Sequence, residues 1–187
     1  MKNLYLIILV FLASTFFSTN ATSQTTIIDG NDERENGPLY IFYKYGLFQH
    51  IYTSSEVGAA SNINGLQWEW DGSTAQTRTI KVWLGNTEVV EFTSNGSNAV
   101  PTTSMTLVYD GTIDLPGGGG VTWEDVIFSQ QFSYDGSSNL VIAVEDNTGS
   151  YVSGTSASQF SHMARTNNDD KTLYYYNDNT NPSMESP

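Results

Sequence analysis

The sequence predicts an all-β protein, an antiparallel β-sandwich or jelly roll, with an N-terminal signal peptide. Asp-Gly and Asn-Gly dipeptides, which favour tight hairpin turns, recur at short intervals along the 187 residues. The segments between them are rich in Val, Ile, Thr, Tyr, Phe and Trp, and many alternate apolar and polar residues. No window of a dozen residues has the periodicity of a capped helix, which favours two packed sheets. The turn dipeptides are Asp29-Gly30, Asn36-Gly37, Asn64-Gly65, Asp71-Gly72, Asn95-Gly96, Asp110-Gly111 and Asp135-Gly136.

The first 23 residues have the pattern of a secretory signal peptide. Lys2 gives a positive start, residues 4–17 form an almost unbroken apolar run, and Ala21 and Ser23 supply the small residues of a cleavage site. The apolar run is too short for a membrane span. We therefore expect residues 1–23 to be removed, and the mature chain to be secreted or displayed at the outer cell surface without inserting into a membrane.

Two stretches give the clearest strand patterns. Residues 66–71 alternate so that Trp68 and Trp70 share one face, which predicts a half-buried strand with both tryptophans in the core. Residues 79–84 alternate in the same way and place Trp83 on the polar side. Further strands are expected at residues 88–93, 105–109, 128–134, 160–165 and 172–176.

Other segments have more specific expectations. Residues 140–144 are apolar on both faces, which is typical of a central strand. Residues 123–128 are the one candidate for a helical turn, and Asp135-Gly136 is expected to close a hairpin. Residues 116–120, one proline and four glycines, predict a flexible loop tip.

The expected domain organisation has one folded unit. Residues 24–37 are interpreted as a flexible lead-in, and residues 38–187 as the β-sandwich domain. Residues 177–187 are polar, contain two prolines and end without a closing strand, so a C-terminal strand is expected to be missing.

Composition narrows the function classes. The chain has 20 acidic and 7 basic residues, a formal net charge of −13, so nucleic acid and anionic lipid are poor partners. The acid excess suits divalent cations, or simply keeps an exported protein soluble. The absence of cysteine excludes a disulfide scaffold and a cysteine nucleophile. His50 and His162 lie far apart in sequence and no catalytic motif is present, so the chain is predicted not to be an enzyme.

One stretch of the sequence is distinctive: FSYDGSSNLV at residues 132–141, followed by VEDN at 144–147. Further characteristic stretches lie at residues 38–58, 65–68, 81–87 and 107–111. Together they resemble an adhesin-like β-sandwich module of secreted and cell-surface Bacteroidota proteins. The resemblance implies a jelly-roll module, often N-terminal in proteins of the type IX secretion pathway, with roles in adhesion or matrix rather than catalysis.

The chain departs from this resemblance at its end. Such modules continue past a Tyr-rich strand and an Asn-Pro turn into one more strand, whereas this sequence stops at Pro187. Two interpretations stay open. The sequence is a fragment of a larger protein, or a partner chain supplies the strand and the protein is a filament subunit.

Two kinds of binding residue are predicted. Oxygen-rich turns are candidates for calcium, which prefers carboxylate, amide and carbonyl oxygens, although Asp and Asn also cap turns on their own. The calcium candidates are Asp135, Asn139, Asp146, Asp169 and Asp170. Exposed aromatic rings are candidates for stacking on sugars, although a sandwich also needs aromatic residues in its core. The glycan candidates are Trp83, Trp123 and Tyr175.

The sequence therefore predicts a non-catalytic extracellular adhesion or scaffolding module, with glycans as candidate ligands. No cofactor is predicted as a requirement, and calcium is the candidate ion for stabilising the fold. Its expected partners are surface glycans, other extracellular proteins or further copies of itself. The alternatives are a filament subunit assembled by strand complementation, and an accessory module of a larger secreted hydrolase.

Overall fold

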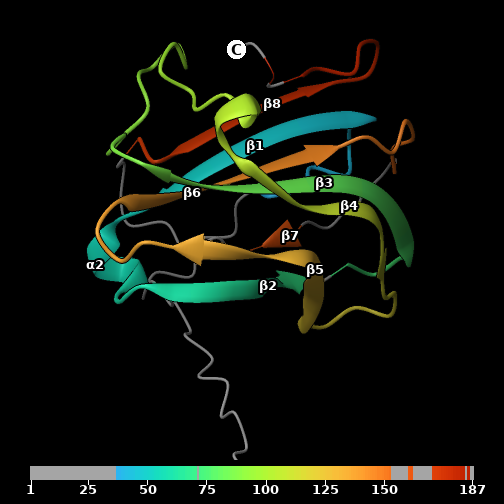
Figure 1. Ribbon diagram of the computed structural model, residues 1–187. Helices are drawn as coiled ribbons and strands as arrows, with labels where there is room; N and C mark the ends of the chain where they lie inside the picture. Colours follow the sequence, from blue (N-terminus) through green and yellow to red (C-terminus); the bar gives the residue numbers. More distant parts are fainter. Residues whose placement is uncertain (1–36, 71, 153–159, 162–169, 184, 186–187) are drawn as a thin grey trace, which may run out of the picture.

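The computed structural model describes residues 37–70, 72–152, 160–161, 170–183 and 185, and in this part the chain forms two antiparallel sheets (Figure 1). The five-stranded sheet has the order β4-β3-β6-β1-β8, and the three-stranded sheet the order β5-β2-β7. This arrangement confirms the predicted all-β sandwich. The strands are β1 (Tyr45–Tyr52), β2 (Ser61–Trp70), β3 (Gln76–Thr87), β4 (Thr106–Leu115), β5 (Thr122–Tyr134), β6 (Asn139–Asp146), β7 (Phe160–Ser161) and β8 (Thr172–Asn177), with a short helix α2 (Ser54–Val57) and a 3-10 turn (Thr102–Ser104).

The core lies between the two sheets. Alternation along β3 directs Ile80, Val82 and Leu84 inward, where they are fully buried, and β2 contributes Trp68 and Trp70 from the opposite sheet. These residues confirm the faces predicted from the period-two pattern. Because fully burying one large apolar side chain contributes about 1.5–3 kcal/mol, this core is the main source of stability in a chain without disulfides.

Strand β6 is buried on both faces, which confirms the central strand predicted at residues 140–144. Its inward residues join the core between the sheets, and Val141 packs outward against Ile51 and Phe92. The outer cover comes from residues 88–105, which cross the outside of the five-stranded sheet. Gln49 fastens this cover, since its amide donates to the Val100 carbonyl at 2.6 Å and accepts from the Val100 N–H at 3.0 Å.

The predicted strand at residues 88–93 is wrong, because the structure has irregular chain there. The apolar residues that suggested a strand serve to cover the sheet instead. Phe92 is buried, and its N–H donates to the Asp170 carbonyl at 2.6 Å rather than to a neighbouring strand.

Two predicted turns lie inside strands. Asn64-Gly65 is in β2 at a shift of register, and Asp110-Gly111 is in the middle of β4. A Cβ at Gly65 would lie 2.9 Å from the Val126 carbonyl oxygen, and one at Gly111 would lie 3.2 Å from the Tyr109 hydroxyl. These glycines permit close approach of neighbouring groups, so their turn pattern was misleading.

Two further expectations concerned the ends of β5. Residues 123–128 are not a helical turn, because they are bonded into β5 opposite β2. Asp135-Gly136 does not close a hairpin either, because it joins β5 in one sheet to β6 in the other. Gly136 has a φ of +76° at this corner, a value that favours glycine. The prediction of a turn at this dipeptide is therefore right, and the prediction of a hairpin is wrong.

The glycine-rich segment at residues 116–120 also crosses between the sheets, from β4 to β5. The loop contains three consecutive positive φ values, +111°, +73° and +91°, at Gly118, Gly119 and Gly120. Residues other than glycine rarely adopt such values. Gly118 donates its N–H to the Ser73 carbonyl at 3.0 Å, so this loop is fastened to the β2–β3 connection.

Several sequence predictions fall outside the described residues. These are the signal peptide, the lead-in at residues 24–36, most of the strand expected at 160–165, and the calcium candidate Asp169. In the part of the chain that the structure describes, no helix is both long and apolar enough to cross a membrane.

Candidate binding surface

The most exposed tryptophan lies on the outer face of the three-stranded sheet. Trp123 is 56% exposed and sits near the start of β5, opposite Glu69 of β2. The neighbouring Glu124 pairs with Trp68, whose side chain is in the core, so alternation turns Trp123 outward. This orientation agrees with the exposure expected for the glycan candidate Trp123.

Further side chains share this outer face, because β5 directs every second residue outward. Asp125 lies opposite Gln67, whose amide donates to the Asp125 carboxylate at 2.6 Å. Ile127 follows, 68% exposed. We call this surface the β5 platform; its members are Gln67, Glu69, Trp123, Asp125 and Ile127. It extends for roughly 14 Å along β5, at about 3.4 Å per residue.

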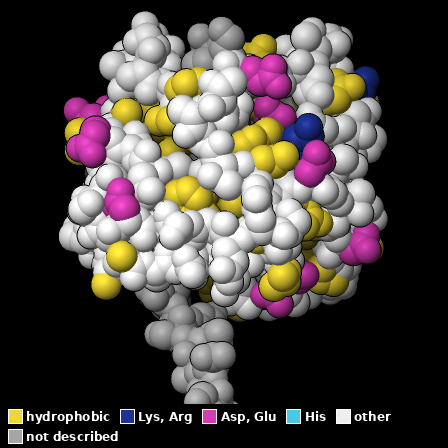
Figure 2. All heavy atoms as spheres, in the orientation of Figure 1, with side chains coloured by type: hydrophobic (Ala, Val, Ile, Leu, Met, Phe, Trp, Pro, Cys, Tyr) yellow, Lys and Arg dark blue, Asp and Glu magenta, His cyan; other side chains and the backbone are white. Residues whose placement is uncertain are grey.

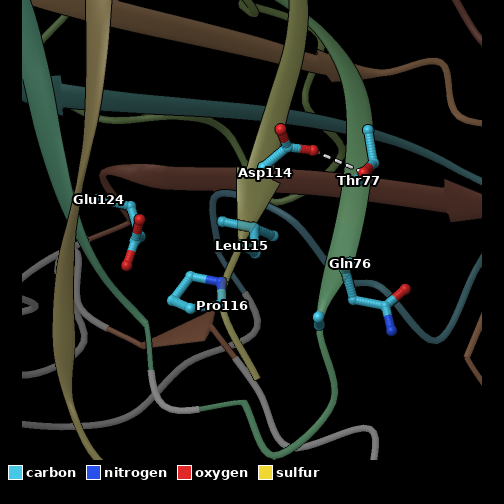
Figure 3. A pocket seen from close by; sticks show the side chains of 7 residues that line it. Gln76, Thr77, Asp114, Leu115, Pro116 and Glu124 are labelled. Carbon is cyan, nitrogen blue, oxygen red and sulfur yellow. Dashed lines mark hydrogen bonds between the residues drawn. The ribbon is translucent and has the colours of Figure 1, made fainter. Parts of the chain in front are cut away.

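A hollow opens beside the platform, at the end of the sandwich where β5 begins (Figure 3). Its volume is about 510 Å³, and its walls combine two carboxylates with amide, hydroxyl and apolar groups. Asp114 accepts a bond from the Thr77 hydroxyl at 2.6 Å, and Glu124 accepts one from the Thr122 hydroxyl at 2.6 Å. The hollow is lined by Ala75, Gln76, Thr77, Asp114, Leu115, Pro116 and Glu124.

The adjacent acids Glu124 and Asp125 therefore serve two different surfaces. Glu124 faces the hollow, whereas Asp125 lies on the β5 platform, as alternation along a strand requires. Neither surface could be predicted from the sequence, because each includes residues from distant strands. Gln67 comes from β2, and Asp114 comes from β4.

The other two glycan candidates lie on the opposite side of the sandwich. Trp83 is half-buried on the outer face of the five-stranded sheet, and Tyr175 is 51% exposed on the same face. They belong to β3 and β8, with β6 and β1 between them, and so are about 14 Å apart across the sheet. The structure thus does not bring Trp83, Trp123 and Tyr175 into one site.

Three calcium candidates have their side-chain oxygens bonded within the protein. Asp146 pairs with the buried Arg78. Asn139 accepts from the Ser54 N–H at 3.1 Å, and its amide donates to the Val89 carbonyl at 2.9 Å. Asp135 caps its own turn.

The remaining candidates do not define a metal centre either. Asp170 is exposed, and its backbone carbonyl accepts the bond from the Phe92 N–H. Among the described residues, no group of three or more His, Asp or Glu side chains is placed to hold a metal ion. Acidic side chains in Figure 2 stand in small, separated groups. Calcium binding stays a prediction.

Asp135 is held ionised by the turn it caps. The N–H groups of Ser137 and Ser138 donate to its carboxylate at 2.7 and 2.8 Å, and the Ser138 hydroxyl donates at 2.7 Å. These bonds lower the pKa of Asp135 from 3.8 to about 2. These bonds come from the two serines that follow Asp135 in the same turn, so they stabilise the local backbone conformation. The Asp135 carboxylate therefore has a structural role in this turn.

We expect Asp135→Ala to lower the melting temperature at pH 7 and to have little effect near pH 2. The folded pKa lies below the unfolded value, so the stabilisation is complete above about pH 3.8 and is lost as pH falls through about 2. Thermal melts of both proteins from pH 7 to pH 2 measure the difference. A difference that stays constant across this range would contradict the assignment.

The fold and the β5 platform together define an all-β sandwich with an exposed face that combines a tryptophan, carboxylates and an amide. Comparison with protein-family models, with curated protein sequences and with solved structures finds no match for this chain. The chain's own geometry is therefore the basis for inferring its function.

Proposed function

We propose that this protein is a non-catalytic binding module of the extracellular surface, and that it binds carbohydrate on the β5 platform. The observation that carries the proposal is the position of Trp123, a tryptophan 56% exposed on a sheet face beside hydrogen-bonding groups. An indole that is not needed in the core offers a flat apolar surface on which the C–H face of a sugar ring can stack.

The neighbours of Trp123 supply the polar half of such a site. Glu69 lies directly across from it, and Asp125 follows two residues later on the same face. Carboxylates accept bonds from sugar hydroxyls, and the Gln67–Asp125 bond fixes one of them in advance. Because these groups stand on paired strands, little conformational freedom is lost on binding.

Charge narrows the class of carbohydrate. The β5 platform contains two carboxylates and no basic residue, and the whole chain has a net charge of −13. Sulfated or uronic glycans would be repelled, so the proposed ligands are neutral or amino sugars. The signal peptide predicted from the sequence and the resemblance to adhesin-like modules support an extracellular setting for this binding.

A glycan array tests the proposal. We expect the mature protein, residues 24–187, to bind neutral glycans, and Trp123→Ala to weaken binding about tenfold or more, which corresponds to about 1.4 kcal/mol. Tyr175→Ala is the matched control, because it removes a comparably exposed ring from the other sheet. Equal binding by the Trp123 variant, or no binding by the wild type across the array, would contradict the proposal.

A further inference from the structure

Strand β8 is the last strand at one edge of the five-stranded sheet. Within the described part of the chain it pairs with β1 alone, in a register that places Phe48 opposite Tyr174. The Ile51 N–H donates to the Lys171 carbonyl at 3.0 Å, which fixes the phase of the alternating bonds. Residues 173, 175 and 177 therefore bond to β1, and the backbone groups of residues 172, 174 and 176 point away from the sheet.

The other edge of this sheet is protected. Among the described residues β8 has no second partner strand, although the Phe92 N–H donates to the Asp170 carbonyl on this side just before the strand begins. At β4, the Ser129 hydroxyl donates to the Val108 carbonyl and the Gln130 amide donates to the Leu107 carbonyl. Strand β8, with the sequence TLYYYN, has no charge, proline or bulge of the kind that usually blocks edge pairing.

The chain after β8 turns away from the edge. The Asn177 side chain accepts bonds from the N–H groups of Asn179 and Thr180 at 2.7 and 3.1 Å, which forms a turn. Asn181 then donates to Asn147, beyond the end of β6, at 2.8 Å. The described part of this tail therefore crosses the end of the sheet and leaves β8 uncovered.

Aromatic contacts hold β8 in a fixed shape. The rings of Tyr174 and Tyr176 are stacked at 5.8 Å, and Tyr176 packs against Tyr43 at 4.2 Å and Tyr40 at 5.0 Å. A strand that is already rigid loses little entropy when it pairs. Tyr174 is nevertheless 54% exposed, so it offers apolar surface to a partner.

We propose that β8 pairs with β8 of a second copy of this chain, antiparallel across a two-fold axis at Tyr174. In this register Tyr174 faces its own counterpart, Tyr175 faces Leu173, and Tyr176 faces Thr172. Residues 172, 174 and 176 each exchange two backbone bonds with the residue they face. The strand is complementary to itself, because aromatic and aliphatic side chains meet and no charges oppose each other along it.

The proposed dimer is independent of the carbohydrate proposal and leaves its surface free. The β5 platform is on the other sheet, and β5 packs beside β4, at the edge opposite β8 (Figure 1). A dimer would therefore present two platforms, which suits an adhesion module that binds repeated sugars. Just outside the two ends of β8, this register places Asp170 opposite Asp178 of the second copy. Because like charges repel and salt screens the repulsion, the affinity of the dimer should rise with added salt.

Sedimentation velocity of the mature protein tests this pairing. We expect twice the monomer mass at about 100 μM, in line with the micromolar affinity typical of a small interface. Tyr174→Pro is expected to be monomeric, because its N–H points away from β1 and proline blocks only the new pairing. Tyr174→Ala keeps this N–H and should dimerise more weakly, with unchanged circular dichroism.

A second variant guards against misfolding of the proline protein. Tyr174→Lys places two like charges face to face at the axis, and should also be monomeric. A monomeric wild type, a dimeric Tyr174→Lys protein, or assemblies that keep growing with concentration would overturn the proposal.

Discussion

Replacing Asp146 by alanine is expected to destabilise the protein by about 3–5 kcal/mol, because it leaves the Arg78 charge buried without its partner. Arg78 and Asp146 are only 1% and 2% exposed. The Arg78 Nε donates to the carboxylate at 3.0 Å, and its other nitrogens donate to the Ser150 carbonyl at 2.9 Å and the Tyr43 carbonyl at 3.2 Å. The second carboxylate oxygen accepts the Thr148 N–H at 3.0 Å.

Urea unfolding of Asp146→Ala measures this loss. The matched control is Asp110→Ala, which removes an exposed pair with Lys81 at 3.5 Å and should cost about 0–1 kcal/mol. The double change Arg78→Met with Asp146→Leu should recover much of the loss, since no charge then stays buried. A loss below about 1 kcal/mol for Asp146→Ala would show that water reaches Arg78.

Replacing Trp70 by alanine is also expected to destabilise the protein by about 3–5 kcal/mol, because it removes one of the two tryptophan side chains of the core. Trp70 is 1% exposed, and its indole N–H donates to the Pro116 carbonyl at 2.6 Å. Its ring also fills the space above Gly72, where a Cβ would lie 1.8 Å from a ring carbon. One side chain thus supports the core, the β2–β3 connection and the glycine-rich loop.

The variant Trp70→Phe separates these roles. It keeps most of the apolar volume but loses the bond to Pro116, and should cost less than the alanine variant in the same urea experiment. Hydrogen exchange should then rise at Gly118, whose N–H depends on the same loop. Equal costs for the two variants would contradict this division.

Local patterns in the sequence were sufficient to predict which side chains of a strand point into the core. They were not sufficient to predict which strands pair with each other. The alternation at residues 66–71 and 79–84 correctly predicted buried Trp68 and an outward Trp83. The same kind of reasoning could not show that Asp135-Gly136 joins two sheets, because tight turns within and between sheets favour the same residues.

The candidate site was predictable only in its aromatic member. Trp123 was recognised as a residue that could face solvent, but Gln67 and Glu69 join it through the register of β2 against β5. Asp146 illustrates the same limit, since its partner Arg78 is 68 positions away. A short oxygen-rich motif in the sequence looks the same whether its carboxylate binds a calcium ion or a distant arginine. The motif alone therefore could not distinguish these two roles for Asp146.

The most direct test of the carbohydrate proposal is to follow the indole N–H signals of the four tryptophans by nuclear magnetic resonance. The labelled mature protein is titrated with the neutral glycan that gives the strongest array signal, and Trp123→Phe assigns its peak. We predict that the Trp123 signal moves, while those of the buried Trp68 and Trp70 and of Trp83 on the other sheet stay in place. Movement of the Trp83 signal alone, or of none, would contradict binding on the β5 platform.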